Sequence, residues 1–279
     1  MKKSLLTILF ILLTKSVQAD QHIEKKNYEK NKCLLIYEDN KFIVNQTDGN
    51  CDIRHAPCST FKIAISLIGY DSGFLIDENE PLINYREGYV DTLDSWRKPQ
   101  NPISWIKNSC IWYSQIILRN IGIEKFFQYL NLFNYGNKIS DTSDKKNAIY
   151  DSWISSSLKI SPREQIFFLK NFLENKFKLS NKSIANTKNI LHVADLENSW
   201  KLYGKTGSCD IESQGSQPIQ SVWFVGWIEK NNRKIIFADY LEELESKDYY
   251  FSKSAKEDLL DNINKILKIK TKDNITENK

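Results

Sequence analysis

Apolar residues along this chain form strand-like runs near its two ends and helix-like runs between them. The first two runs are joined by Asp39-Asn40, a pair that predicts the turn of a β-hairpin. The later runs are rich in Trp, Phe, Val and Ile, which favour a pleated sheet. The expected strands are residues 33–38, 41–45, 200–206, 222–229 and 234–239. Within them we expect Trp223, Phe224 and Trp227 to pack both faces of a sheet.

The middle of the chain has the apolar spacing of helices. The expected helices are residues 59–68, 105–121, 124–132, 162–173 and 252–269. The fourth begins with the clearest signal, Ser161 as N-cap and Pro162 at the first helical position. This order predicts an α+β fold: one antiparallel sheet built from both chain ends, flanked by helices, with a large all-helical insertion at about 72–183. A ligand site is expected in the cleft between sheet and insertion.

The first 19 residues have the pattern of a secretory signal peptide. Lys2 and Lys3 precede an apolar run over residues 5–13, and the segment ends at Ala19, a small residue suited to cleavage. The run is shorter than the ~20 residues that span a bilayer, and no later segment is long and apolar enough to anchor the protein. We therefore expect cleavage near Ala19 and export to the periplasm, with no membrane anchor.

The formal charge of the chain, +4, comes mostly from this segment. Removing residues 1–19 takes away three lysines and no acid, which leaves 36 basic against 35 acidic residues. Nucleic acids need a clustered basic surface, so we expect no nucleic-acid partner. The remaining length fits a single domain at 20–269, followed by a polar tail at 270–279. These properties leave open whether the protein is a monomer or a homodimer.

The five cysteines are too few for a disulfide scaffold, and an odd number cannot all pair within the chain. Cys33 and Cys51 flank the expected hairpin, so one bridge between them is an option after export to an oxidising compartment. Cys58 and Cys110 are expected to act as small buried apolar residues. The cysteines and the three histidines show no zinc-binding spacing, and we expect no metal.

A serine three residues before a lysine is the most informative chemical pattern in the chain. At Ser59 and Lys62, a helix would place hydroxyl and amine on one face, with Cβ atoms ~5–6 Å apart. A serine nucleophile needs such a base within reach. The same spacing starts at Ser95, Ser104, Ser143 and Ser156. Those four lie in the predicted insertion, whereas Ser59 follows the hairpin and precedes a Lys-Thr-Gly tripeptide at a strand end, so its context favours it.

Five short motifs follow one another along the mature chain and cover nearly all of it. They are Pro57-x-Ser59-Thr60-Phe61-Lys62, Ser109-x-Ile111, Tyr135-Gly136-Asn137, Trp153 with Leu158-Lys159-Ile160-Ser161, and Lys205-Thr206-Gly207. In this order they resemble the class D, oxacillinase-type serine β-lactamases. The resemblance implies a β-lactamase/penicillin-binding transpeptidase-like fold. It also implies hydrolysis of β-lactam antibiotics, such as penicillins, through a covalent acyl-serine, with β-lactam resistance as the result.

The resemblance implies a role for each catalytic residue. Ser59 would be the nucleophile. Lys62 would be carboxylated by carbon dioxide or bicarbonate to N6-carboxylysine and would act as general base, with no other cofactor. Burial favours this modification because it lowers the pKa of a lysine and so favours the neutral form of the amine. Trp153 would donate its indole N–H to the carbamate, and Ser109 would pass a proton toward the leaving lactam nitrogen.

The resemblance also implies a substrate-binding set. Lys205 and Thr206 would hold the substrate carboxylate, with Gly207 allowing close approach. The backbone N–H groups of Ser59 and Ser208 would form the oxyanion hole. Ile111 would supply an apolar wall beside the lysine. Many family members carry an arginine near the start of the last helix, which this chain lacks; Lys253 is the candidate substitute, although lysine has no bidentate fork.

Each residue also has an ordinary structural interpretation. Ser59 could be an N-cap, Trp153 a core residue and Ser109 a helix hydroxyl bonded to its own backbone. Two other functions use the same fold: a β-lactam sensor that is acylated without turnover, and a penicillin-binding D,D-peptidase. Sensors are normally fused to transmembrane segments, and the peptidases tend to have Ser-x-Asn where this chain has Ser109-Cys110-Ile111. The motif set therefore favours the hydrolase.

Overall fold

The described part of the chain forms a sheet with helices packed on it. A computed structural model describes residues 31–47, 50–138, 151–154, 157–211 and 219–244. The predicted signal peptide, the predicted helix at 252–269 with Lys253, and the tail at 270–279 lie outside these residues. Within them, no helix is long and apolar enough to cross a membrane.

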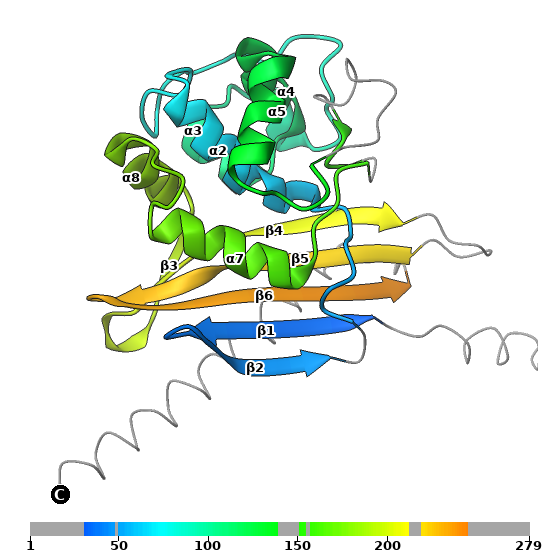
Figure 1. Ribbon diagram of the computed structural model, residues 1–279. Helices are drawn as coiled ribbons and strands as arrows, with labels where there is room; N and C mark the ends of the chain where they lie inside the picture. The colour runs from blue at the N-terminus through cyan, green and yellow to red at the C-terminus, as the bar shows by residue number, and fades with distance from the viewer. Residues whose placement is uncertain (1–30, 48–49, 139–150, 155–156, 212–218, 245–279) are drawn as a thin grey trace, which may run out of the picture. The chain divides into compact units, whose positions relative to one another are not determined.

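Six strands form one antiparallel sheet in the order β2-β1-β6-β5-β4-β3 (Figure 1). They are β1 (Lys32–Glu38), β2 (Lys41–Thr47), β3 (His192–Asp195), β4 (Lys201–Ile211), β5 (Ile219–Lys230) and β6 (Arg233–Leu244). Leu35 of β1 lies opposite Ala238 of β6, so strands from distant parts of the chain are neighbours. The prediction of an antiparallel sheet built from both ends is confirmed.

All five predicted strands are present, and β4, β5 and β6 extend beyond the predicted segments. The sixth, β3, was not predicted. It has four residues, His192-Val193-Ala194-Asp195, and lies at the edge of the sheet. So short a segment, with polar residues at both ends, carries too little apolar alternation to predict a strand.

The α-helices lie on one side of the sheet in Figure 1. The helical elements are η1 (Cys58–Phe61), α2 (Lys62–Asp71), η2 (Asp94–Arg97), α3 (Pro102–Asn108), α4 (Ile111–Ile121), α5 (Ile123–Leu132), α7 (Pro162–Leu173), α8 (Asn181–Ile190) and η3 (Glu197–Ser199). The predicted helix at 162–173 is confirmed at both ends. Although α7 lies within the stretch 72–183, it packs against β1, β5 and β6, so this part of the chain belongs to the layer that covers the sheet.

One predicted helix is wrong in its extent. Residues 105–121 form two helices, because α3 ends at Asn108 and α4 begins at Ile111. Between them, Ser109 has left-handed backbone at φ 55° and Cys110 is extended. Buried apolar side chains continue across the break, so the periodicity of the sequence does not reveal it.

Apolar side chains fill both faces of the sheet. Trp223 and Trp227 belong to a large cluster between the sheet and the helices. Phe224 points to the opposite face, where it joins a smaller cluster with Trp200 and Phe237. Successive strand residues face opposite sides, and the expectation for this run of β5 is confirmed.

Two disulfides crosslink the described residues. Cys33 is bonded to Cys51, which realises the option raised by the sequence. Cys58 is bonded to Cys209, 151 residues away. The expectation that Cys58 acts only as a small apolar residue is therefore wrong, because the fold brings β4 against η1 and places the two cysteines within bonding reach. Cys110 is free and buried, as expected.

The capping box of α7 gives a test of the fold. The Ser161 side chain accepts from the N–H of Glu164, and the Glu164 carboxylate accepts from the N–H of Ser161. Ser161→Ala leaves one buried N–H without this acceptor and should lower the free energy of unfolding by ~0.5–2 kcal/mol. Urea titration measures the change. Thr92→Ala, at an exposed loop position, is the control, and an equal loss in both variants would contradict the assignment.

Candidate active site

Ser59 and Lys62 meet at the junction of η1 and α2. The Nζ atom of Lys62 lies 3.1 Å from the Oγ atom of Ser59, within hydrogen-bond distance. Ser59 is half-buried, whereas Lys62 is 0% exposed. The helix begins as a 3₁₀ turn at Cys58, one residue before the predicted start. The pairing expected from the spacing is present.

The other Ser-x-x-Lys repeats do not make such a pair where they are described. Ser104 belongs to the capping box of α3, and its partner Lys107 is exposed. Lys98, the partner of Ser95, is exposed as well. Ser143 and Ser156 lie outside the described residues. Burial of its lysine therefore distinguishes the Ser59 repeat from the other described repeats.

Burial controls the protonation of Lys62. Removal from water disfavours its ammonium form and is the largest cause that lowers its pKa well below the ordinary value. The positive charge of Lys205 lowers this pKa further, while Cys110 acts in the opposite direction. Burial thus favours the neutral amine of Lys62, which is the form able to act as a base or to react with an electrophile.

Trp153 is buried, and among the described residues its indole Nε1 has no hydrogen-bond partner. Its ring packs against Phe61, at a centroid distance of 6.0 Å, in the turn that carries Ser59 and Lys62. Its backbone carbonyl accepts from the N–H of Cys58 at 3.0 Å. A buried N–H without an acceptor is costly. Trp153 therefore combines a core position with an N–H donor that is available close to the turn carrying Ser59 and Lys62.

Ser109 and Ile111 lie where α3 gives way to α4. Ser109 is the left-handed C-cap residue of α3 and is half-buried. Ser109 therefore lies at an interruption between two helices and not within one. Cys110, the next residue, is close enough to influence the pKa of Lys62, so this junction adjoins the lysine. Ile111 starts α4, where it is half-buried and packs on the core.

The strand β4 presents Lys205, Thr206, Gly207 and Ser208 along the sheet edge beyond β3. Lys205 is 6% exposed, and its Nζ donates to the carbonyl of Thr206 at 3.0 Å. Burial lowers the pKa of Lys205 to about 8. Thr206 is half-buried and Ser208 is exposed. Together they offer an ammonium, a hydroxyl and a backbone edge to an anionic ligand.

Gly207 is required by the close approach of β4 to η1. A Cβ at this position would lie 3.0 Å from the carbonyl oxygen of Pro57 and from the backbone N of Thr60. Any larger residue would push the strand away from the turn that carries Ser59. The Lys205-Thr206-Gly207 tripeptide therefore contributes its backbone geometry to the candidate site as well as its side chains.

A network of buried polar side chains contacts the turn that carries Ser59 and Lys62. Gln165 of α7 donates through Nε2 to Thr60 Oγ1 at 3.1 Å and to the hydroxyl of Tyr135 at 3.4 Å. Thr60 Oγ1 in turn donates to the carbonyl of Pro57. Sequence reasoning missed Gln165, because a single glutamine on an amphipathic helix carries no signal of burial. It links the Tyr-Gly-Asn motif to the Ser-Lys turn.

The Tyr135-Gly136-Asn137 motif is structural. Asn137 exchanges backbone and side-chain hydrogen bonds with Lys159 at 2.9 Å, and it donates to the carbonyl of Ser157 at 2.8 Å. Gly136 has φ +52°, and a Cβ there would overlap the carbonyl of Lys159. The motif fixes the segment that follows Trp153.

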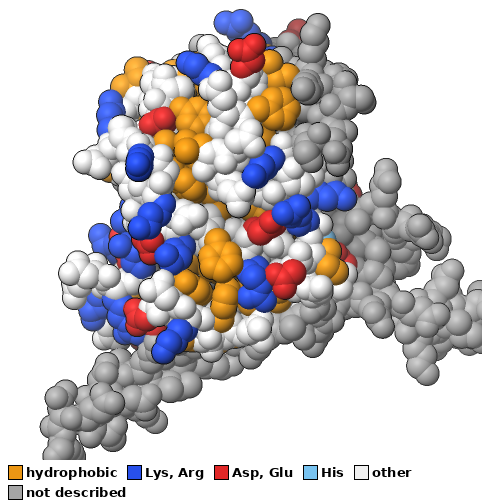
Figure 2. Space-filling model, in the orientation of Figure 1, with side chains coloured by type: hydrophobic (Ala, Val, Ile, Leu, Met, Phe, Trp, Pro, Cys, Tyr) orange, Lys and Arg blue, Asp and Glu red, His pale blue; other side chains and the backbone are white. Residues whose placement is uncertain are grey.

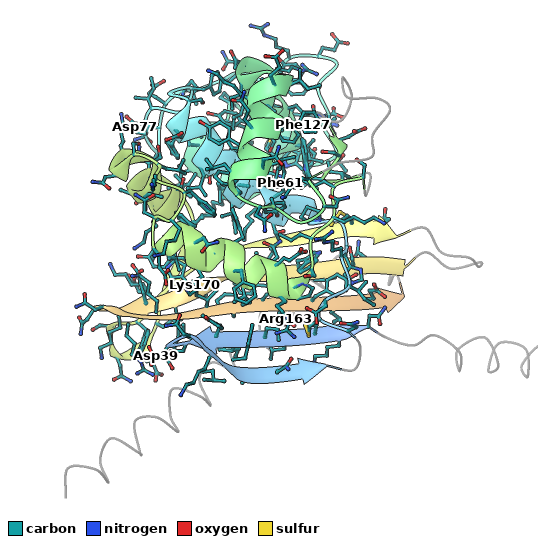
Figure 3. The ribbon with its side chains drawn as sticks, in the orientation of Figure 1. Asp39, Phe61, Asp77, Phe127, Arg163 and Lys170 are labelled. Carbon is teal, nitrogen blue, oxygen red and sulfur yellow. A yellow bond between two sulfur atoms is a disulfide. The ribbon has the colours of Figure 1, made fainter. Side chains whose placement is uncertain are left out.

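Other parts of the described chain lack this chemistry. A cavity of about 690 Å³ lies between α8 and the β3–β4 edge, but none of the Ser59, Lys62 or Lys205 side chains lines it. Lys188 in its wall is paired with Glu229 at 2.9 Å. Among the described residues, no group of three or more His, Cys, Asp or Glu side chains is arranged to hold a metal ion. Figure 3 labels Phe61 beside the helices, above the sheet.

Comparisons with known proteins identify the family of this chain. Residues 18–265 match the model of the penicillin-binding protein transpeptidase domain. Beta-lactamase OXA-9 of Klebsiella pneumoniae is 31% identical over 265 residues, 93% of this chain and 96% of that protein. The crystal structure of OXA-427, a class D β-lactamase, matches with TM-score 0.77 and 35% identity over 85% of this chain and 98% of that chain. Regulatory protein BlaR1 of Bacillus licheniformis is 30% identical over 189 residues, 68% of this chain and 29% of that protein.

The fold and the Ser-Lys site define a protein of the penicillin-binding transpeptidase class. Within that class, the chain belongs to the class D β-lactamases. The resemblance seen in the five sequence motifs is confirmed.

Gly136 gives a test of how the site is supported. Gly136→Ala places a side chain at positive φ and against the Lys159 carbonyl. Gly73→Ala also has positive φ, at +79°, but would meet nothing within 4 Å. The backbone cost alone is ~1–2 kcal/mol, and the overlap should add ~1–3 kcal/mol for Gly136→Ala. Equal losses in the free energy of unfolding, measured by urea titration, would contradict the packing described here.

Proposed function

We propose that this protein hydrolyses β-lactam antibiotics through a covalent acyl-serine intermediate, with Ser59 as nucleophile and carboxylated Lys62 as general base. The observation that carries the proposal is the 3.1 Å contact between Ser59 Oγ and the Nζ of a fully buried lysine whose pKa is strongly lowered. Membership of the class D β-lactamases supports the reaction type.

The residues around Lys62 fit a carbamate. Burial favours its neutral amine, its side chain is fully buried, and within the described residues the buried indole N–H of Trp153 has no acceptor. Carbon dioxide bound to Nζ would supply an anionic oxygen more basic than water and less basic than a free amine. Trp153 would be its donor, because no acceptor in the described part of the chain engages that N–H.

The chain's own residues then account for the bond changes. Ser59 Oγ attacks the lactam carbonyl, its proton leaves toward Lys62, and the N–H groups of Ser59 and Ser208 stabilise the negative oxygen. Ser109 delivers a proton to the lactam nitrogen as the carbon–nitrogen bond breaks, which leaves an ester on Ser59. Water cleaves this ester, releasing the ring-opened acid and restoring the serine.

Lys205 and Thr206 bind the carboxylate that penicillin-type substrates carry. Lys205 is buried within β4 and supplies the positive charge. Ile111 would form an apolar wall, and Lys253 remains our candidate for the role of the missing arginine.

We also propose cleavage near Ala19, export to the periplasm and a single catalytic domain at 20–269.

A sensor function is the second candidate, because the chain is also similar to BlaR1. A sensor would be acylated at Ser59 and would not release product. A D,D-peptidase would act on peptidoglycan stems instead of β-lactams. Turnover separates all three: only the hydrolase consumes many equivalents of penicillin.

The base role of Lys62 can be tested by substitution. Lys62→Ala should lower kcat for a penicillin by ~10²–10⁴-fold, the usual contribution of a general base. Lys107→Ala removes the exposed lysine of the Ser104 repeat and should leave kcat unchanged. Wild-type turnover in Lys62→Ala would refute the role.

Carboxylation has its own readout. In ¹³C-bicarbonate, wild-type protein should show a carbamate carbon signal by NMR that is absent from Lys62→Ala, and added bicarbonate should raise kcat. Trp153→Phe keeps the ring packing and removes the N–H, so its carbamate signal should weaken. An unchanged signal in Trp153→Phe would exclude the indole as the donor, and no signal in wild type would leave the neutral amine as the base.

The pH dependence of substrate binding follows from Lys205. Its pKa is lowered to about 8, so its positive charge is present at pH 7 and is lost as the pH rises through 8. The value of kcat/KM for a penicillin should therefore fall about tenfold between pH 7 and pH 9, because this ratio reports ionisations of the free enzyme. Lys205→Arg keeps its charge at pH 9 and should flatten this alkaline limb. A fall of the same size in both proteins would contradict the assignment.

A further inference from the structure

The Cys58–Cys209 disulfide joins the two segments that carry the oxyanion-hole donors. Cys58 directly precedes Ser59, and Cys209 directly follows Ser208. The Cα atoms of the two cysteines are 5.7 Å apart, although 151 residues separate them in sequence. Each cysteine is the chain neighbour of a residue whose backbone N–H we propose for the oxyanion hole, so the crosslink joins the two segments that supply these donors.

The edge of β4 faces the Ser59 turn. The N–H of Gly204 points away from β5, because it donates to the carbonyl of Leu191 at 2.9 Å. Strand geometry repeats every two residues, so the N–H of Ser208 points to the same edge. β3 pairs with β4 only at Lys201–Tyr203 and does not reach Ser208. Ser59 is the second residue of η1, whose first N–H groups have no acceptor within the helix.

Few other bonds hold these two segments in register. Gly207 of β4 packs closely on Pro57 and Thr60. No backbone hydrogen bond joins Pro57–Phe61 to Lys201–Ile211, both of which the structure describes in full. The neighbouring strand β5 adds one tie, from Trp223 Nε1 to the carbonyl of Ala56 at 2.9 Å. The disulfide is the covalent link between the nucleophile turn and the strand edge.

The backbone at Cys58 also depends on support. Its φ is +50°, a left-handed conformation that is unfavourable for a residue with a Cβ. Its N–H is held by the carbonyl of Trp153 and its sulfur by Cys209. Release of the sulfur would allow the turn to relax toward negative φ, and the N–H of Ser59 would turn with it.

We infer that the Cys58–Cys209 disulfide is a positioning element of the oxyanion hole, which sets the separation and direction of the Ser59 and Ser208 N–H groups. This inference rests on the proposed hydrolysis. Reduction of the disulfide breaks the S–S bond and adds two electrons and two protons, supplied by a dithiol that becomes a cyclic disulfide. The two thiols that result no longer fix the two amides. The reduced protein should therefore be folded but slow.

The test compares two disulfide-free variants. Cys58→Ala/Cys209→Ala should lower kcat for a penicillin about tenfold or more, since loss of a whole oxyanion-hole donor costs ~10²–10³-fold, while KM changes little. Cys33→Ala/Cys51→Ala removes the other crosslink and should lower the thermal midpoint with kcat unchanged. A purely structural role for Cys58–Cys209 would lower its midpoint and leave kcat unchanged, and that result would overturn the inference.

Reduction of the wild-type protein gives the same answer if the double variant does not fold. Dithiothreitol is applied well below the thermal midpoint, and the reduced cysteines are identified by alkylation and peptide mass. The kcat of wild type and of Cys33→Ala/Cys51→Ala should fall and return on reoxidation. Unchanged kcat with Cys58 fully alkylated would overturn the inference. Failure of the oxidised wild type to hydrolyse any β-lactam would instead overturn the proposed function, and this inference with it.

Discussion

The burial of Lys62 is the constraint on which the rest of the site depends. An ammonium group in this position would be removed from water beside a second lysine, Lys205, so the structure favours the neutral amine. A neutral amine next to Ser59 Oγ is the form that can react with carbon dioxide, which our proposal requires for the base that a serine lacks by itself. The cost of burying a lysine is met by the large core that surrounds it, which includes Phe61 and Trp153. Stability and chemistry therefore share the same side chains.

The sheet brings the two halves of the site together. The strands β4 and β5 follow the helical region in sequence, yet β4 packs on η1 at the start of that region. The close contact at Gly207 and the Cys58–Cys209 disulfide hold this junction. Figure 2 shows one face of the molecule with basic and acidic side chains interspersed over much of its surface. In our proposal the positive charge that binds the substrate belongs to the buried Lys205, which does not require a broad basic surface.

Much of the fold could be predicted from the sequence, because strands such as residues 222–229 have strong apolar patterns. The start of α7 was predicted to the residue, since Ser161-Pro162 is an unambiguous cap. The break at Ser109 could not be predicted, because buried apolar residues continue through it. The short edge strand β3 has too few residues to show a pattern.

The candidate site also contains some residues that could be predicted from the sequence and others that could not. The Ser59–Lys62 contact follows from helical spacing, which is local. The partner of Cys58 and the burial of Gln165 depend on contacts across more than 100 residues, for which a single sequence holds no local signal. The unpartnered N–H of Trp153 also becomes visible only in three dimensions. The residues that we propose to react could therefore be predicted from local patterns, whereas the residues that support them are identified only from the three-dimensional structure.

The central claim is that Ser59 forms an acyl-enzyme that is released by water. Intact-mass spectrometry of the purified protein, mixed with a tenfold excess of a penicillin and sampled over time, tests it most directly. The account predicts a penicilloyl adduct on Ser59 that appears, then disappears as all of the penicillin is converted to ring-opened acid. A stoichiometric adduct that persists while the excess penicillin stays intact, or no adduct and no product, would contradict it.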